Sequence, residues 1–316
     1  MKKIIGTTLV VLAILALSVL GIVLGNNNLS DNQLHTLFIL SLICGGSILY
    51  CFVVGEITRN NSQMDKLWSL LPIAYTWVVA AMGGFKLRLI IIAVISTLWG
   101  IRLTYNFARK GAYKLKFWEG EEDYRWAVLR QNKAFQNKFV WGLFDLFFIS
   151  IYQNVLILAF TLPAVAVMES TASFGGWDIA ATVLASLFLI LELVADAIQW
   201  RFHKKKRALL NEGKKLEELP YPYNLGFNTL GIWGFMRHPN YLGEQGIWMS
   251  LYLFVIGAGV ATYGIFNWSI VGPLFLIMLF MGSSNLGEKI SSSKYPKYKD
   301  YQKQVFKYLP LRKYKD

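Results

Sequence analysis

The segment GIWGFMRHPNYLGEQG, residues 231–246, concentrates side chains that can hold an anion or move a proton. They are Arg237, His238, Asn240, Tyr241 and Glu244. Pro239 lacks an N–H and fixes its own φ, so it suits the first turn of a helix. A helix start with free N–H groups beside cations is an anion site, and a phosphate or pyrophosphate would fit there. The alternative is an interfacial anchor of arginine and tyrosine.

A second polar group follows one face of the apolar run over residues 177–199 and its exit. Its members recur at i, i+4, i+7 and i+11, which is one helix face, and are Glu192, Asp196, Gln199 and His203. A polar stripe on a membrane helix must face protein or water rather than lipid. The stripe is therefore either a hydrogen-bonded seam between helices or a wall of a cavity that opens to the cytoplasm.

A third group surrounds Asp65 in the segment NSQMDKLWSLLP. Either this acid is favoured by the dipole at a helix start, or it lies beside a reactive carbonyl. Farther along the chain, Arg102 and Tyr105 lie one turn apart inside an apolar run. An arginine so deep needs a partner, and Asp65, Asp145 or a ligand would serve.

The C-terminal tail is the fourth group. Glu288 and Lys289 follow the last apolar run, and tyrosines then alternate with lysines at Tyr295, Tyr298 and Tyr301. The tail either lies on anionic lipid or folds over the other cytoplasmic loops and closes a site. No GxGxxG follows a strand, so a dinucleotide would bind in a helical cavity. No Cys/His cluster has metal-ligand spacing, and we expect no metal.

Long apolar segments of the chain separate the four polar groups and must position them. Hydrophobic residues make up 55% of the chain and charged residues 16%. Runs of roughly 20 apolar residues cross a bilayer as helices. Eight such runs cover residues 4–24, 34–55, 67–84, 89–108, 141–168, 177–199, 246–266 and 268–282. The composition predicts an all-α, polytopic integral membrane protein with about eight transmembrane helices, in a range of roughly seven to ten. We expect one membrane domain over residues 1–316, in which residues 1–33 are a peripheral first span and loop.

The basic residues test this topology. With alternating spans and a cytoplasmic N-terminus, 29 of the 32 Lys and Arg residues fall on the cytoplasmic side, as the positive-inside rule predicts. Both termini are then cytoplasmic. The net charge of +13 follows from topology and from attraction to anionic lipid, and its division among loops argues against nucleic-acid binding. The polar loop over residues 110–138 is predicted to contain an interfacial helix.

Together these segments resemble the steroid 5-alpha-reductase-like family, specifically its bacterial branch. The resemblance runs from about residue 45 to residue 312. The matching segments are NSQMDKLWSLLP, WGIRLTYNFAR, EGEEDYRWAVLR, LELVADAIQW, GFNTLGIWGFMRHPNYLGE, and the tail from Glu288 through YPKYKDYQ to LP. The resemblance implies an all-helical membrane enzyme that binds NADPH in a cytoplasm-facing cavity and reduces the carbon–carbon double bond of an enone.

By position, the resemblance implies that Asn240, Glu244 and Asp196 contact the cofactor. Asp65 stands where the animal steroid reductases carry a glutamate that holds the substrate carbonyl with a tyrosine. Because this acid is Asp rather than Glu, and Tyr105 or Arg102 would replace the tyrosine, steroid specificity does not transfer. The cofactor site expected from the motifs and the resemblance together comprises Asp196, Arg201, Arg237, His238, Asn240, Tyr241, Glu244, Glu288, Lys289 and Tyr298.

The expected function is therefore an NADPH-dependent reduction of an apolar lipid or steroid-like substrate that enters from the bilayer, in a bacterial inner membrane and with no obligate protein partner. Two alternatives remain open. Related membrane methyltransferases of the isoprenylcysteine carboxyl type share the Arg-His-Pro signature and use S-adenosylmethionine. A non-enzymatic lipid-binding protein would leave Asp196, Asn240 and Glu244 without a shared ligand.

Overall fold

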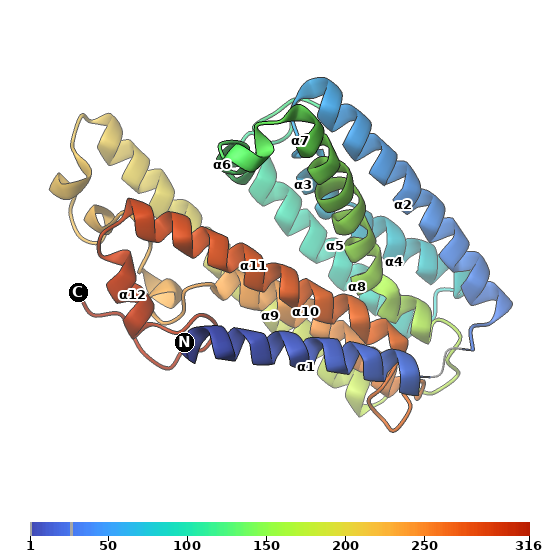
Figure 1. Ribbon diagram of the computed structural model, residues 1–316. Coiled ribbons are helices and arrows are strands. Elements are labelled where there is room, and N and C mark those ends of the chain that lie inside the picture. Colours follow the sequence, from blue (N-terminus) through green and yellow to red (C-terminus); the bar gives the residue numbers. More distant parts are fainter. Residues whose placement is uncertain (1, 26–27) are drawn as a thin grey trace. The chain divides into compact units, whose positions relative to one another are not determined.

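Helices are the regular structure of this protein. The computed structural model describes residues 2–25 and 28–316, and over these ranges it contains twelve α-helices, short 3-10 turns, one π-helical segment and no β-strand (Figure 1). The α-helices are α1 Lys2–Leu24, α2 Asp31–Thr58, α3 Gln63–Trp68, α4 Leu71–Met82, α5 Leu87–Ala108, α6 Tyr124–Arg130, α7 Lys138–Phe144, α8 Gln153–Val167, α9 Gly176–Asn211, α10 Pro239–Gly257, α11 Val271–Lys294 and α12 Tyr298–Gln304. The all-α prediction is confirmed.

Five segments in the described part of the chain are long and apolar enough to cross a membrane. They are Asp31–Thr58, Leu87–Ala108, Lys138–Val167, Gly176–Asn211 and Trp268–Lys294. A helix pairs most of its backbone polar groups within the segment, as hydrocarbon requires of a spanning segment. The prediction of a polytopic membrane protein is confirmed, and shorter apolar helices accompany the five.

Two predicted spans differ from the helices that form. The run over residues 67–84 contains the twelve-residue helix α4, which is about 18 Å long and begins where Pro72 occupies its first turn. The run over residues 246–266 is also displaced, because α10 begins at Pro239 and ends at Gly257. Gly259 and Gly264 have positive φ values and turn the chain beyond α10. Residues 239–244 of the polar segment therefore form the opening turns of α10, as Pro239 predicts, and Arg237 and His238 precede the helix.

Contacts divide the chain into two compact units. Unit 1 comprises Met1–Thr182 and Ser250–Leu276, and unit 2 comprises Val183–Met249 and Ile277–Asp316. The boundaries fall inside α9, α10 and α11. The expectation of one domain stays a prediction, and each unit is described by itself.

Helices α2, α4, α5 and α8 lie side by side in unit 1 (Figure 1). Their core contains the fully buried side chains of Tyr75, Trp99 and Phe160. At one end of the bundle, Arg88 pairs with Asp178 at 2.6 Å, and both side chains are buried. Such a pair stabilises one arrangement only when both partners are present, since a lone buried charge is costly.

Glycines set the approach of α9 to α10 within unit 2. A Cβ at Gly246 would lie 2.4 Å from the ring of Phe188, and one at Gly243 would lie 2.9 Å from Cβ of Glu192. The C-terminal end of the chain forms a small core of its own. Its buried members are Leu225, Phe227, Tyr298, Tyr301, Val305 and Tyr314.

Candidate functional site

The tail of the chain folds against the segment that begins α10. The backbone N–H groups of Arg237 and His238 donate to the carbonyls of Phe306 at 3.1 Å and Lys307 at 3.0 Å. Farther along the tail, the N–H of Tyr314 donates to the carbonyl of Gly234 at 2.8 Å. Of the two alternatives for the tail, the structure has the one in which it folds over another polar segment.

Glu288 of α11 joins this segment to the tail. Its carboxylate accepts hydrogen bonds from Arg237 Nε at 2.8 Å, His238 Nε2 at 2.9 Å and Gln302 Nε2 at 2.7 Å. The Glu288 side chain is only 3% exposed. Hydrogen bonds to an ionised group in a buried place are among the strongest in proteins. Glu288 was predicted to contact a cofactor; in the structure it positions the two residues that precede α10.

Most hydrogen-bond donors of the Arg237 side chain are used by contacts within the protein. Besides the bond from Nε to Glu288, its Nη1 donates to the backbone carbonyls of Gln302, at 3.2 Å, and Val305. These bonds leave Nη2 as the guanidinium nitrogen that none of them uses. The side chain is 7% exposed, so its direction is set by the protein and not by solvent.

His238 is held neutral beside two aromatic rings. Burial lowers its pKa, an effect that Glu288 opposes and that the positive charges of Lys307 and Arg237 reinforce. Since a carboxylate can only accept, the proton of the neutral imidazole lies on Nε2 and Nδ1 carries a lone pair. The ring stacks on Tyr241 with centroids 5.2 Å apart. Tyr241 is thereby fixed at the start of α10.

Asn240 and Glu244 follow each other by one turn of α10, as the i, i+4 spacing predicts. Glu244 is 4% exposed. The Oδ1 atom of Asn240 is buried and accepts no hydrogen bond from the described residues. A buried acceptor without a donor costs about 1–3 kcal/mol, so native proteins rarely leave one unless a ligand or water satisfies it.

The polar stripe of α9 is hydrogen-bonded in its second half. Gln199 contacts His203 at 3.1 Å and accepts from Nδ2 of Asn228 at 2.9 Å. Asp196 is half-buried between these residues and the buried Glu192. These bonds run within α9 and to the loop that carries Asn228, so the choice between a seam between helices and a cavity wall stays open.

The remaining predicted cofactor residues are not gathered around α10. Arg201 and Lys289 are exposed. Tyr298 is buried in the aromatic core of the tail, with its ring 5.0 Å from that of Phe227. Sequence spacing suggested all three because they flank the motifs, but spacing does not tell which side of a helix turns inward.

Unit 2 also uses residues that the sequence did not single out. Lys206 is buried, and its Nζ donates to the carbonyl of Gly226 at 2.6 Å. Lys307 donates to Ser284 at 3.0 Å and Asn285 at 2.8 Å. The only local signal for Lys206 is its place in the basic run HKKKR, residues 203–207. Gln302 and Lys307 carry no local signal at all.

Asp65 in unit 1 is 7% exposed and has specific partners. Its Oδ2 accepts from Ser62 at 2.7 Å and from the indole N–H of Trp126 at 2.9 Å. Its Oδ1 accepts from Arg125 at 3.2 Å. Burial raises the pKa of Asp65, and the nearby Arg125 opposes the rise. The carboxyl therefore has both oxygens engaged and still a raised affinity for a proton.

Side chains of residues 60–66, the segment around Asp65, form hydrogen bonds that fix the loop over residues 117–126. Lys66, which is fully buried, donates from Nζ to the carbonyls of Phe117 and Glu119, each at 2.7 Å. Gln63 donates to the carbonyl of Trp118 at 2.9 Å, and Asn60 to that of Gly120 at 3.0 Å. Beyond the loop, the predicted interfacial helix forms as the seven-residue α6. We name residues 60–66 and 117–126 together the Asp65 clamp.

Arg102 and Tyr105 occupy different sides of α5. Arg102 and Asn106 are each 7% exposed and share the buried side. Tyr105 is 64% exposed, and the guanidinium of Arg109 lies over its ring at 5.4 Å. Three residues along a helix turn the side chain by about 60° from the starting direction, which is enough here to separate an inward from an outward position.

No group of three His, Cys, Asp or Glu side chains in residues 2–25 and 28–316 could hold a metal ion. Cys44 and Cys51 are both free and buried in α2.

Comparisons with known proteins identify relatives of this chain. Residues 51–305 match a family described as "Protein of unknown function (DUF1295)". An uncharacterised protein of Schizosaccharomyces pombe is 36% identical over 281 residues, which cover 83% of this chain and 78% of the relative. No solved structure matches the chain.

Proposed function

Because this chain belongs to the DUF1295 family, which is steroid 5-alpha-reductase-like, we propose that it is a membrane-embedded reductase. In this proposal it uses NADPH to reduce the activated carbon–carbon double bond of an enone in an apolar lipid or steroid-like molecule. The family supports a membrane reductase in general. The fission yeast relative is uncharacterised and so supplies neither activity nor substrate. Its presence in a yeast also removes any ground for assigning the chain to a bacterial branch by family alone.

The observation that carries the proposal is the start of α10. It combines donors that suit phosphates with acceptors that suit amide and hydroxyl groups. The donors are Arg237 Nη2 and the first backbone N–H groups of the helix, which have no intrahelical acceptor. The acceptors are the buried Oδ1 of Asn240 and the buried carboxylate of Glu244. NADPH carries phosphates, ribose hydroxyls and a carboxamide, so the donor and acceptor set fits it.

Each predicted residue then has a role in the proposal. Asn240, Glu244 and Asp196 accept from the hydroxyl and amide groups of the cofactor. Arg237 and Tyr241 direct donors to it. Glu288 acts on Arg237 and His238 and is a positioning residue.

The peripheral residues of the predicted site have other roles. Since Arg201 and Lys289 are exposed, the proposal gives them a part in attracting an anionic cofactor through solvent, a steering effect that weakens with salt. Tyr298 packs the tail that carries Gln302 and so acts on the site through Glu288.

The cofactor supplies a hydride, and the protein must stabilise the negative charge that develops on the substrate oxygen. Asp65 remains the proposed group for this task, because its raised pKa favours the protonated form that can donate to an oxyanion. Arg102, buried on α5, is the alternative cation. Tyr105 is the weakest of the three, since its hydroxyl belongs to an exposed side chain.

The test begins with the purified full chain in detergent. We expect NADP(H) to co-purify, visible by absorbance and mass spectrometry, and NADPH to raise the melting temperature. Protection by S-adenosylmethionine instead would overturn the reductase in favour of the methyltransferase. Protection by neither would favour the lipid-binding alternative.

We further propose that both termini lie in the cytoplasm, while the bacterial inner membrane stays a prediction of the resemblance. The distribution of the basic residues supports this orientation. Reporter fusions at each terminus test it, and an extracytoplasmic C-terminus would overturn it.

A further inference from the structure

Two cavities adjoin at one end of unit 1. The first has a volume of about 520 Å³ and includes Gln33, Glu169, Asn267 and Trp268 in its lining. The second has a volume of about 400 Å³ and is lined mainly by apolar side chains, among them Leu87, Leu89, Val167 and Phe174. Residues 170–172 line both cavities and form the wall between them.

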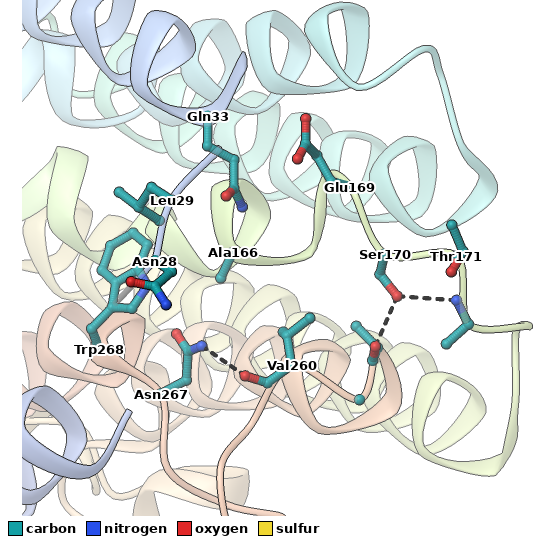
Figure 2. Close-up of a pocket in the computed structure, with 13 residues that line it drawn as sticks. Asn28, Leu29, Gln33, Ala166, Glu169, Ser170, Thr171, Val260, Asn267 and Trp268 are labelled. Carbon is teal, nitrogen blue, oxygen red and sulfur yellow. Dashed lines mark hydrogen bonds between the residues drawn. The ribbon is translucent and has the colours of Figure 1, made fainter. Parts of the chain in front are cut away.

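Hydrogen bonds keep the loops around the first cavity in place. Gln33 donates to the carbonyl of Val165 at 2.9 Å, and Asn267 donates to that of Val260 at 3.1 Å. Ser170 donates to the carbonyl of Ala258 at 2.8 Å and accepts from the N–H of Ala172. Figure 2 shows the bonds of Asn267 and Ser170, with Asn267 and Trp268 on one side of the cavity and Ser170 and Thr171 on the other. The cavity is therefore framed before any ligand arrives.

The two cavities lie at the membrane boundary. Around them are the first residues of α2 and α5, the last residues of α8, the loop that precedes α9, and the turn that leads into α11. Each of these helices belongs to a segment that can cross the membrane. The Asp65 clamp follows the opposite end of α2, which is about 42 Å away along 28 residues. The cavities therefore face the other side of the bilayer from the clamp.

One charge of each sign borders the shared wall. Glu169 lines the first cavity, is exposed, and makes no ion pair or hydrogen bond with the described residues. Lys86 lines the second cavity, and its Nζ donates only to the carbonyl of Ser170 at 3.2 Å within the part of the chain that the structure describes. The other cation of that cavity, Arg88, is buried and already paired with Asp178. The available charges are thus one carboxylate and one ammonium.

We propose that the two cavities bind one zwitterionic phospholipid, with its phosphate at Lys86, its ammonium at Glu169 and the adjoining part of its acyl chains against Leu87 and Phe174. The chemical order of the lipid matches the order of the site. The acyl chains pack in the apolar second cavity, and the phosphate binds Lys86 at the border of that cavity. The terminal ammonium pairs with the carboxylate of Glu169 on the other side of the shared wall. An anionic lipid without an amine would leave Glu169 unpaired and facing a like charge.

This inference is independent of the proposed reductase activity, because it rests on unit 1 residues that the proposal does not use. Ethanolamine and choline headgroups share the chemistry that it requires. A headgroup with N–H donors can also hydrogen-bond to Glu169, whereas a choline group offers charge alone. The test therefore includes both headgroups.

Native mass spectrometry of the full chain in detergent measures the affinity for the first bound lipid. The probes are dioleoyl phosphatidylethanolamine, dioleoyl phosphatidylcholine and dioleoyl phosphatidylglycerol. We expect the two zwitterionic lipids to bind more tightly than the anionic one. Partly exposed ion pairs contribute up to about 1 kcal/mol, so Glu169→Gln should weaken both zwitterionic lipids by about two- to fivefold. The same variant should bind phosphatidylglycerol more tightly, because the like charge of Glu169 is gone. Lys86→Gln should weaken all three lipids by a similar factor.

Exposed residues elsewhere supply the controls. Glu217→Gln and Lys299→Gln make the same charge changes at exposed positions of unit 2, and we expect neither to alter the affinities. Melting temperatures of all four variants show whether the fold is intact. The proposal is overturned if phosphatidylglycerol binds as tightly as the zwitterionic lipids, or if Glu169→Gln leaves the preference between them unchanged.

Discussion

The carboxylates of Asp65 in unit 1 and Glu288 in unit 2 accept hydrogen bonds from similar sets of groups. Each accepts from an arginine and from two neutral side chains: Arg125, Ser62 and Trp126 in one case, and Arg237, His238 and Gln302 in the other. Their surroundings differ. Beside Asp65, the neighbouring polar side chains donate to backbone carbonyls of a loop, as Lys66 does. Beside Glu288, a helix begins that contains the unmatched Oδ1 of Asn240.

The difference teaches where to look for a ligand. A buried acid that collects donors is equally compatible with catalysis and with holding a loop. A buried acceptor that lacks a donor stabilises nothing in the protein and is costly unless something else pairs with it. By that criterion the start of α10, where Asn240 Oδ1 is such an acceptor, is a candidate binding site. The role of Asp65 has to be separated from the structural role of its clamp.

The largest effect is expected when Glu288 is removed. Glu288→Ala leaves Arg237 buried without its carboxylate, and breaking a buried ion pair in this way costs about 3–5 kcal/mol. Thermal melting of the full chain measures the loss. Lys289→Ala is the matched control, because it changes the exposed neighbour on the same helix. Equal melting temperatures for the two variants would show that Glu288 does not hold unit 2 together.

The next prediction distinguishes a catalytic role of Asp65 from a role in holding the loop over residues 117–126. If Asp65 stabilises the oxyanion, Asp65→Ala should lower kcat and kcat/KM together by roughly 10²–10³. Asp65→Asn keeps the size and one donor, so it should retain more activity. Steady-state kinetics on any accepted enone, with melting temperatures alongside, measures both effects.

Trp126→Phe is the matched variant for the clamp. It removes one donor to Asp65 and leaves the acid in place. If Asp65 only holds the loop, Trp126→Phe and Asp65→Ala should both lower the melting temperature, and both should leave turnover intact. A full-rate Asp65→Ala enzyme would end the catalytic role and direct attention to Arg102.

Asn240 should behave unlike any residue of the clamp. Asn240→Ala should leave the melting temperature unchanged or higher without ligand, because the Oδ1 atom that it removes has no donor in the described part of the chain. It should weaken NADPH binding by about tenfold, the value of one buried hydrogen bond of about 1.4 kcal/mol.

Glu244→Ala should also weaken NADPH binding. Titration of both variants with NADPH measures the effect, and Asn211→Ala and Glu217→Ala at exposed positions serve as controls. Unchanged affinity in both Asn240→Ala and Glu244→Ala would remove the start of α10 from the cofactor site.

The smallest expected effect concerns how stability changes with pH. On acidification, the contributions of Asp65 in unit 1 and His238 in unit 2 to stability should change in opposite directions. The pKa of Asp65 is raised by burial, so the native state binds this proton more tightly than the unfolded state, and the contribution of Asp65 to stability rises as pH falls towards about 4. The pKa of His238 is lowered by burial, so the unfolded state takes up this proton first. Its contribution falls as pH drops below about 6.5.

Melting temperatures from pH 8 to pH 5 test the signs. Asp65→Asn should steepen the loss of stability on acidification, and His238→Gln should reduce it. The groups that face His238 are Glu288, Arg237 and Lys307, and they are unchanged in both variants. Parallel profiles for both variants and the parent chain would contradict the assignment.

Local chemistry was sufficient to predict the class of fold and the polar start of α10. Long apolar runs can satisfy their backbone in a membrane only as helices, and Pro239 followed by Asn240 and Glu244 specifies a helix start with one polar side. The sequence pattern failed at the ends of the spans. It could not show that α10 ends at Gly257 or that α4 has only twelve residues, because turns at Gly259 and at residues 69–70 interrupt runs that remain apolar.

Only the tertiary structure decided which side chains become hydrogen-bond partners. The partner of Arg237 lies 51 residues away at Glu288, and that of Asp65 lies 61 residues away at Trp126. No periodicity links such positions, since their meeting depends on how closely helices approach, as at Gly243 and Gly246. The sequence by itself therefore determined that the chain is helical, that several helices can span a membrane, and that a polar motif begins α10. Packing alone decided that Glu288 supports this motif, that Asp65 anchors a loop, and that Asn240 retains a buried acceptor without a donor in the described part of the chain.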